Sequence, residues 1–144
     1  MPMALTIDAS VVGDVMFIGE RTAAARAHLG TAHRMIAPAV LVSEVLSTAT
    51  KQHRVSGVPE AHARERWEFA RTLPIELIDD ALFAEDAFEL AIRLRHPSGD
   101  CLYLAAAISH GAPLVTGDRR LYDRAVAAGL GEHVRWVEDP PTAV

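Results

Sequence analysis

Short apolar runs alternate with longer stretches of helical periodicity along the chain. The sequence predicts buried strands at residues 3–7, 34–37, 74–78, 113–116 and 133–137. The intervening pattern predicts helices at about 11–29, 38–54, 59–72, 79–94, 100–110 and 119–129. Strands that alternate with helices in this way favour a parallel sheet that is covered by helices on both faces.

Turn and cap residues set the expected ends of these helices. The first helix is expected to end near Gly30, and Pro38 suits the first turn of the second helix. Asp79 or Asp80 is expected to cap the fourth helix, which carries an apolar face at helical spacing. The stretch 100–110 is almost entirely apolar, which predicts a helix that is buried on most sides.

An aspartate comes just after two of the predicted strands. Asp8 follows the strand at 3–7, and Asp118 follows the strand at 113–116. Ligands of parallel sheets bind beyond the carboxyl ends of the strands, where the strand order reverses. If these two strands are neighbours at that point, both carboxylates face one crevice. Each aspartate also has a purely structural explanation, as a turn residue or a helix cap.

Two further acids stand out because their surroundings are apolar. Glu44 is the only charged residue within 35–50 and shares a side of its helix with Leu41. Asp100 begins the most apolar helix of the chain, and no other acid or strong base separates it from Asp118. Glu44 can instead lie at the solvated rim of its helix, and Asp100 can simply cap its own.

Four carboxylates in one crevice would repel one another. At about 4 Å, a single pair costs on the order of 4 kcal/mol at an effective dielectric of 20. Without a cation, some of them would take up protons. Ligands that are all oxygen suit Mg²⁺ or Mn²⁺, and such an ion can activate water and stabilise charge on a scissile phosphate.

Other kinds of catalytic centre are not indicated. The seven histidines form no HExxH or similar pair of ligands, so zinc held by histidine is not expected. The chain has no GxxxxGK[ST], no GxGxxG and no nucleophile elbow.

Composition narrows the class of protein further. Half of the 144 residues are apolar, which argues against disorder. No apolar run approaches membrane-spanning length, and the start lacks the pattern of a secretory signal. The single Cys101 fits a reducing compartment. We therefore expect a cytoplasmic protein with one domain over 1–144 and a loose tail from about 139, and no membrane partner.

The net charge of −5 does not point to a nucleic-acid binder, but net charge does not report local distribution. Small basic groups occur at two places in the chain: Lys51, His53 and Arg54, and Arg119, Arg120 and Arg124. Ordinary solvated helix faces would explain each group equally well.

Four segments in order resemble the signature segments of the PIN domain. They are LTIDASVV at 5–12, APAVLVSEVLS at 37–47, GDCLYLAAA at 99–107 and LVTGDRRLYDRA at 114–125. The chain is most similar to the VapC toxins of bacterial type II toxin–antitoxin pairs. One departure is Gly99, which stands where the family usually has an aromatic or similar residue before the third-segment aspartate.

The resemblance implies a fold and an activity. The fold would be a three-layer α/β/α PIN-like domain with a central parallel sheet ordered 3-2-1-4-5. That order makes the first and fourth strands neighbours, as the crevice requires. The activity would be that of a metal-dependent endoribonuclease that leaves 5′-phosphate and 3′-hydroxyl ends.

The resemblance also implies roles for individual residues. The matching catalytic acids are Asp8, Glu44, Asp100 and Asp118. Asp8, Asp100 and Asp118 would hold one or two Mg²⁺ or Mn²⁺ ions, directly or through water. Glu44 would ligate or orient the attacking water. Ser10 and Thr116 match hydroxyls that help to hold the acids or a water of the site, although both can be plain turn or cap hydroxyls. Asp14 and Asp123 match no signature position and are expected to be surface acids.

Partners follow from the same resemblance. The substrate would be RNA, with single-stranded or loop RNA favoured because its bases are accessible. Candidates to hold the RNA backbone are Lys51, Arg119 and Arg120. A small cognate antitoxin of the VapB type would lay apolar residues on the helices around 41–72 and point an arginine at the acids. A homodimer is common in the family, but no residue in this sequence indicates it.

Three alternatives belong to other classes. A phosphate-binding regulatory module such as a response-regulator receiver needs a lysine after a late strand, and Lys51 is in the wrong place. A haloacid dehalogenase phosphatase needs a second aspartate where Ser10 stands. A catalytically silent PIN-like scaffold is compatible with the pattern, but retention of all four acids argues against it.

Overall fold

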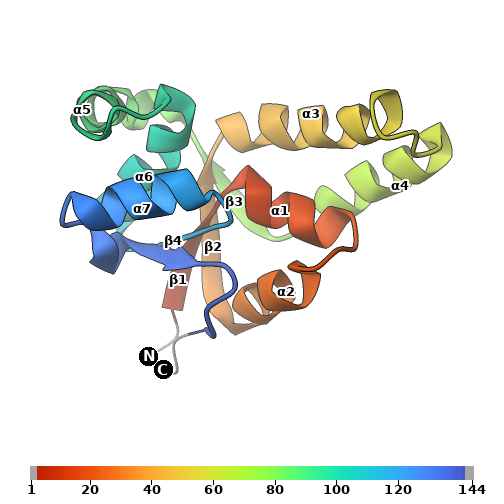
Figure 1. Ribbon diagram of the computed structural model, residues 1–144, viewed down its shortest axis with the longest axis horizontal. Coiled ribbons are helices and arrows are strands. Elements are labelled where there is room, and N and C mark those ends of the chain that lie inside the picture. Colours follow the sequence, from red (N-terminus) through yellow and green to blue (C-terminus); the bar gives the residue numbers. More distant parts are fainter. Residues whose placement is uncertain (1–2, 142–144) are drawn as a thin grey trace.

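The computed structural model describes residues 3–141 and contains a five-stranded parallel sheet (Figure 1). The strands are β1 (Met3–Ile7), β2 (Ala32–Pro38), β3 (Ile75–Ile78), β4 (Leu114–Thr116) and β5 (Val134–Trp136). Their order is β3-β2-β1-β4-β5, which confirms the predicted 3-2-1-4-5 arrangement. Thr6 pairs with Leu114 and Ile7 with Val115, so the strand order reverses between β1 and β4.

Helices cover both faces of this sheet, which confirms the three-layer architecture (Figure 1). They are α1 (Ala9–Met16), α2 (Thr22–Thr31), α3 (Val40–Arg54), α4 (Glu60–Ala70), α5 (Ala84–Leu94), α6 (Ser98–His110) and α7 (Arg119–Ala127). From β1 to β3 the chain moves toward one edge of the sheet, and from β3 to β5 it moves toward the other. Right-handed crossovers therefore put α1 to α4 on one face of the sheet and α5 to α7 on the other. Accordingly, α1 packs against α2, α3 and α4, while α5 packs along α6.

The core lies between the two central strands and α6. Leu5, Ile7, Leu114 and Val115 of β1 and β4 are buried. Small side chains at 105–107 allow α6 to approach β1, β2 and β4 closely. The prediction of a helix buried on most sides is confirmed, because α6 buries Cys101 and every residue from Tyr103 to Ala107.

The single helix predicted over 11–29 is wrong. The chain forms α1 and α2, and it turns between them over 17–21. Thr22 stabilises this turn, because its hydroxyl donates to the Asp14 carbonyl at 2.5 Å and accepts from the Gly19 amide at 2.8 Å. The second of these helices ends at Thr31, beside Gly30, where a helix end was predicted. A hydroxyl that stabilises a turn in this way leaves no mark on the apolar pattern.

Three further helix starts differ from the prediction. Pro38 ends β2, where it pairs with Ile78, and α3 begins at Val40. Asp80 Oδ1 accepts from the Val40 amide at 3.1 Å, so Asp80 provides an acceptor for the first amide of α3 although it lies 40 residues away in the sequence. Asp79 caps a short 3₁₀ helix, η1 (Asp80–Leu82), which precedes α5. The helix expected from 100 begins instead at Ser98.

The end of the described chain is held against α2. The Asp139 amide donates to the Trp136 carbonyl at 3.0 Å, and the Asp139 carbonyl lies 2.8 Å from the ring Nε2 of His28. The predicted loose tail falls partly outside the described residues, because it includes 142–144. Among the helices of the described part, none has the length and apolar character that crossing a bilayer requires.

Candidate active site

Asp8 stands at the carboxyl end of β1, where its carboxylate also caps α1. It is only 5% exposed. Its Oδ1 accepts from the Val11 amide at 3.1 Å and from the Ser10 hydroxyl at 2.5 Å, and its Oδ2 accepts from the Thr116 hydroxyl at 2.5 Å. Asp8 is therefore both the N-cap of α1 and a buried carboxylate in contact with the end of β4.

Two hydroxyls connect this carboxylate to the loop after β4. Ser10 Oγ accepts from the Gly117 amide at 2.9 Å, and Thr116 Oγ1 accepts from the Asp118 amide at 2.9 Å. Each hydroxyl thus donates to Asp8 and accepts from the chain that carries Asp118. The structure therefore gives Ser10 and Thr116 the contacts of residues that hold the acids in place.

Asp118 and Asp100 approach the same point from two helix starts. Asp118 caps α7, because its Oδ1 accepts from the Leu121 amide at 3.1 Å. Asp100 lies in the first turn of α6 and makes no cap bond. Both side chains are about one-third exposed. The positive ends of α1, α6 and α7 converge here, which favours negative groups.

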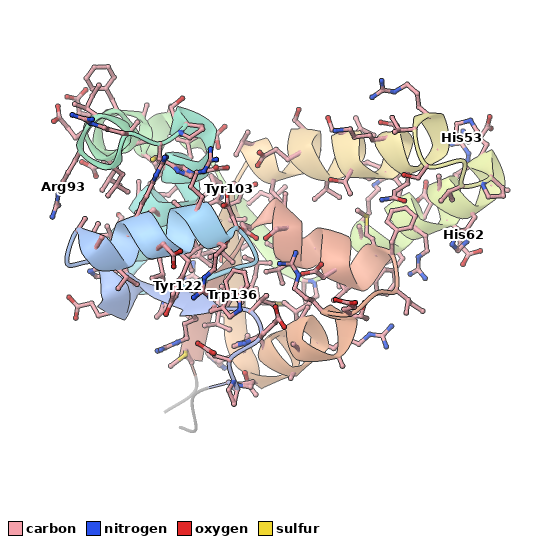
Figure 2. All side chains as sticks on the ribbon, viewed as in Figure 1. His53, His62, Arg93, Tyr103, Tyr122 and Trp136 are labelled. Atoms are coloured by element: carbon pink, nitrogen blue, oxygen red, sulfur yellow. The ribbon has the colours of Figure 1, made fainter. Side chains whose placement is uncertain are left out.

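Glu44 reaches the site from α3 and is held by a buried phenol. Tyr103 of α6, which is 2% exposed, donates its hydroxyl to Glu44 Oε1. Figure 2 shows Tyr103 beside the start of α3, on the side where α6 and α7 lie. Glu44 is therefore half-buried with a partner, and it is not a rim residue in open solvent.

Electrostatics show that the four acids form one group. Burial raises the pKa of Asp8 to about 6, and the Asp100 carboxylate adds to this rise against the bonds from Ser10 and Thr116. Burial also raises the pKa of Glu44, with Asp100 contributing. The pKa of Asp100 is raised by burial first and then by Asp118, while the His96 hydrogen bond opposes the rise. Asp100 is thus close enough to repel each of the other three.

Residues present at this point fit a hard divalent cation. The four acids offer carboxylate oxygens, which is the donor type that Mg²⁺ and Mn²⁺ prefer. The raised pKa values of Asp8, Glu44 and Asp100 show that their anions are costly without a positive charge among them. A cation would remove that cost.

The sequence prediction missed a histidine at this site. His96 is buried, and its Nε2 lies 2.7 Å from Asp100 Oδ2 and 3.8 Å from Asp118 Oδ2. These three residues have potential ligand atoms within 4.8 Å of one another. The only signal in the sequence was the four-residue spacing between His96 and Asp100, in a segment that otherwise predicts a helix break.

Arg21 was also missed, and it contacts the loop after β4 at Gly117. Its Nη1 donates to the Gly117 carbonyl at 2.8 Å, and its Nε pairs with Asp14 at 3.2 Å. A Cβ at Gly117 would lie 2.7 Å from the guanidinium carbon of Arg21. Asp14 is consequently only 17% exposed at its side chain, which corrects its assignment as a surface acid. Nothing in the sequence pairs Arg21 with this loop.

Of the basic residues predicted to hold RNA, two are adjacent to an acid of the site in the sequence and one is not. Arg119 and Arg120 directly follow Asp118 and are exposed. The Arg119 guanidinium lies 4.8 Å from the ring centre of Trp136 and 5.2 Å from that of Tyr122, two rings that Figure 2 shows together beside α7. Lys51 is exposed in the last turn of α3, about two helical turns beyond Glu44.

Arg119 also forms a surface ion pair. Its Nε lies 3.3 Å from Asp123, whose side chain is 61% exposed. Asp123 is thus a surface acid, as predicted.

Comparison with known proteins agrees with this architecture. The sequence model of the PIN domain family matches residues 5–127. A toxin–antitoxin complex from Klebsiella pneumoniae contains a similar fold, with a TM-score of 0.64 and 19% identity over 92% of this chain and 97% of that chain. VapC20 of Mycobacterium tuberculosis, a sarcin–ricin loop cleaving toxin, is similar with a TM-score of 0.63 and 18% identity over 95% of this chain and 99% of that one. No curated protein matches the chain.

Proposed function

The chain belongs to the PIN domain family, and from this premise we propose that it is the ribonuclease toxin of a type II toxin–antitoxin pair. It would hydrolyse RNA phosphodiester bonds with the help of Mg²⁺ or Mn²⁺. The observation that supports this proposal best is the convergence of four carboxylates, from four separate segments, at the carboxyl ends of β1 and β4.

Each acid would have a distinct task. Asp8, Asp100 and Asp118 would hold the cation, which, when bound, would offset phosphate charge and make water a better nucleophile. Glu44 would orient the water that attacks phosphorus in line. Its raised pKa and half-buried position suit a group that accepts a proton from that water. The bond from phosphorus to the 3′-oxygen would break, which leaves a 3′-hydroxyl and a 5′-phosphate.

The RNA backbone would be held at the rim of the site by basic side chains. Arg119 is the best placed of the candidates, because it directly follows Asp118 and is supported by two aromatic rings. Arg120 and Lys51 are exposed and would add further phosphate contacts. An unpaired or loop RNA suits an open rim of this kind. The Mycobacterium tuberculosis protein of similar fold is itself described as cleaving an RNA loop.

An apolar groove supports the proposal of a VapB-type antitoxin. The groove has a volume of about 420 Å³ and lies between α3, α4 and β3, within the stretch where the antitoxin was expected. Leu41 and Val45, which line it, flank Glu44 on α3. A chain segment laid in the groove would therefore end near the acids, where an arginine can pair with them. The similar fold from Klebsiella pneumoniae comes from a toxin–antitoxin complex.

A single surface substitution tests this partner. Val42 lines the groove and is 45% exposed, so Val42→Arg should leave the fold and RNA cleavage intact. It should weaken binding of the antitoxin encoded beside the toxin gene, measured by calorimetry on the purified pair. Unchanged affinity would place the antitoxin elsewhere. The predicted homodimer is a separate association, and light scattering of the purified protein would test it.

RNA cleavage with and without EDTA tests the activity itself. The wild-type protein should cleave RNA in Mg²⁺ or Mn²⁺ and should stop when EDTA is added. Asp8→Asn should lose cleavage while its circular dichroism spectrum stays unchanged, and Asp86→Asn on the exposed face of α5 is the matched control. Full activity of Asp8→Asn would falsify the site. A wild-type protein that binds the antitoxin but cleaves no RNA would instead be a silent scaffold.

A further inference from the structure

His96 is a buried ionisable side chain of the site and lies in the segment between α5 and α6. Its side chain is 2% exposed, and both ring nitrogens have partners. Nε2 lies 2.7 Å from Asp100 Oδ2, and Nδ1 lies 3.0 Å from Arg124 Nη1 on α7. The same Nη1 also donates to the Arg95 carbonyl at 2.6 Å. Both hydrogens of that nitrogen are thereby used.

The Arg124 contact determines where the proton of His96 lies. A guanidinium has N–H donors and no acceptor, so Arg124 donates and His96 Nδ1 accepts with its lone pair. A neutral imidazole whose Nδ1 accepts carries its hydrogen on Nε2. A doubly protonated ring would place an N–H against the guanidinium of Arg124, with like charges in contact. The remaining arrangement has Nε2–H donating to Asp100.

We propose that His96 is a positioning residue that holds the Asp100 carboxylate through Nε2–H, with Arg124 fixing its tautomer, and that it is not itself a ligand of the cation. The inference rests on the ribonuclease function proposed above. A ligating histidine must offer a lone pair, but here the Nε2 lone pair is replaced by a proton. In the cluster formed by His96, Asp100 and Asp118, only the two carboxylates could then bind a cation, and the histidine would act as a hydrogen-bond donor.

The other acids of the site show why Asp100 needs such a donor. Asp8 is held by two hydroxyls, Asp118 by the Leu121 amide and Glu44 by Tyr103. Asp100 sits in the first turn of α6 without a cap bond, and its side chain is hydrogen-bonded to His96. The bond uses one lone pair of Oδ2, so the Asp100 carboxylate keeps further lone pairs that it can offer to a cation.

Nitrogen NMR of the ¹⁵N-labelled full chain tests the tautomer directly. Long-range proton–nitrogen spectra of the metal-free protein should show His96 with its hydrogen on Nε2. Saturating Mg²⁺, which is diamagnetic, should leave that pattern unchanged. If His96 were a ligand, Mg²⁺ would move the hydrogen to Nδ1, and this result would overturn the proposal. Arg124→Met should leave the ring in a mixture of tautomers, because the donor that fixes Nδ1 is gone.

Two substitutions of His96 separate positioning from ligation. His96→Gln retains an N–H for Asp100 and an acceptor for Arg124, whereas His96→Leu retains neither. We expect His96→Gln to bind Mn²⁺, measured by calorimetry, within about threefold of the wild type. His96→Leu should bind about 10–100-fold more weakly, as expected for loss of a residue that orients a ligand. His33→Leu, on the exposed part of β2, is the control.

The outcomes distinguish this inference from the proposed function. Equal loss of Mn²⁺ binding in His96→Gln and His96→Leu would mean that the imidazole is a ligand. Wild-type affinity in both variants, with wild-type RNA cleavage, would show that His96 does not position Asp100. If the wild-type chain binds no Mn²⁺ and cleaves no RNA, the proposed function falls together with this role. If His96→Leu does not fold, the NMR result and His96→Gln decide.

Discussion

The Thr116 hydroxyl donates a hydrogen bond of 2.5 Å to Asp8 Oδ2, and it joins residues that are 108 positions apart in the sequence. The same oxygen accepts from the Asp118 amide at 2.9 Å. One buried hydroxyl therefore ties the carboxyl end of β1 to the loop after β4. It also fixes the relative position of two of the proposed cation ligands.

Thr116→Val should destabilise the protein and weaken cation binding. Valine has nearly the same shape but leaves the partly buried Asp118 amide without its acceptor, which costs on the order of 1 kcal/mol. Asp8 also loses a donor that lowers its pKa. Urea unfolding in EDTA measures the stability, and calorimetry with Mn²⁺ measures the affinity. Thr116→Ser, which keeps the hydroxyl, should recover both, and a valine variant with wild-type stability would contradict the argument.

Asp8→Asn should stabilise the metal-free protein in a pH-dependent way. The pKa of Asp8 rises from 3.8 to about 6 on folding, mainly because of burial. The folded state thus binds this proton more tightly than the unfolded state, so stability falls as pH rises from about 4 to 6. About two pKa units correspond to at most about 3 kcal/mol at neutral pH. Asparagine carries no charge and avoids that loss.

The difference between the two proteins is the quantity to measure. Urea unfolding in EDTA at pH 7.5 should give a higher free energy of unfolding for Asp8→Asn than for the wild type. The difference should shrink as the pH falls through about 4 and vanish at lower pH, where the wild-type carboxyl is protonated in both states. Saturating Mg²⁺ should stabilise the wild type and leave the variant almost unchanged. A lower stability of the variant at pH 7.5 would refute the electrostatic argument.

Tyr103→Phe should shift the pH dependence of RNA cleavage. Burial raises the pKa of Glu44, and the Tyr103 hydrogen bond opposes that rise. Loss of the phenol hydroxyl should therefore raise the pKa of Glu44 further. The acidic limb of the pH–rate profile, where the rate declines as Glu44 is protonated, should move to higher pH. Initial rates over pH 5–8 on one RNA substrate measure the shift.

The matched control for that measurement is Tyr122→Phe. Its ring packs on Trp136, and its hydroxyl bonds to no acid among residues 3–141. Tyr122→Phe should leave the shape of the pH profile unchanged. Identical profiles for Tyr103→Phe and the wild type would show that Glu44 does not need to be ionised for cleavage.

Positions of Asp8 and Asp118 could be predicted because strands leave a strong signal. Each follows a short apolar run, and parallel strands bring their carboxyl ends to one edge of the sheet. Their second role as helix caps is also visible in sequence, because aspartate is a preferred N-cap. One aspartate can therefore cap a helix and also offer an oxygen to a cation, so the two interpretations are compatible.

His96 and Tyr103 could not be predicted for different physical reasons. His96 lies in the break between α5 and α6, and its Nδ1 contacts Arg124 from α7, which is 28 residues away in the sequence. Tyr103 belongs to a helix that is apolar on nearly all sides, so periodicity does not indicate which way its hydroxyl points. In both cases the missing information is a hydrogen bond across the fold.

Arg119→Ala should weaken RNA binding without changing which RNA is preferred. A phosphate contact positions the chain and carries no sequence information, so affinity for unrelated single strands should fall by the same factor. The dependence of log affinity on log salt should lose about 0.7 in slope, the value for one contact to a single strand. Fluorescence titration in EDTA measures binding without cleavage.

Arg71→Ala is the matched control for this experiment. Arg71 also lies over a tryptophan, Trp67, at 5.9 Å and pairs with an acid, Glu68, at 3.5 Å, but it lines the apolar groove. Its removal should leave both affinity and salt slope unchanged. Arg120→Ala and Lys51→Ala extend the measurement to the other two candidates. An unchanged slope in Arg119→Ala would mean that its guanidinium only packs on Trp136 and does not contact RNA.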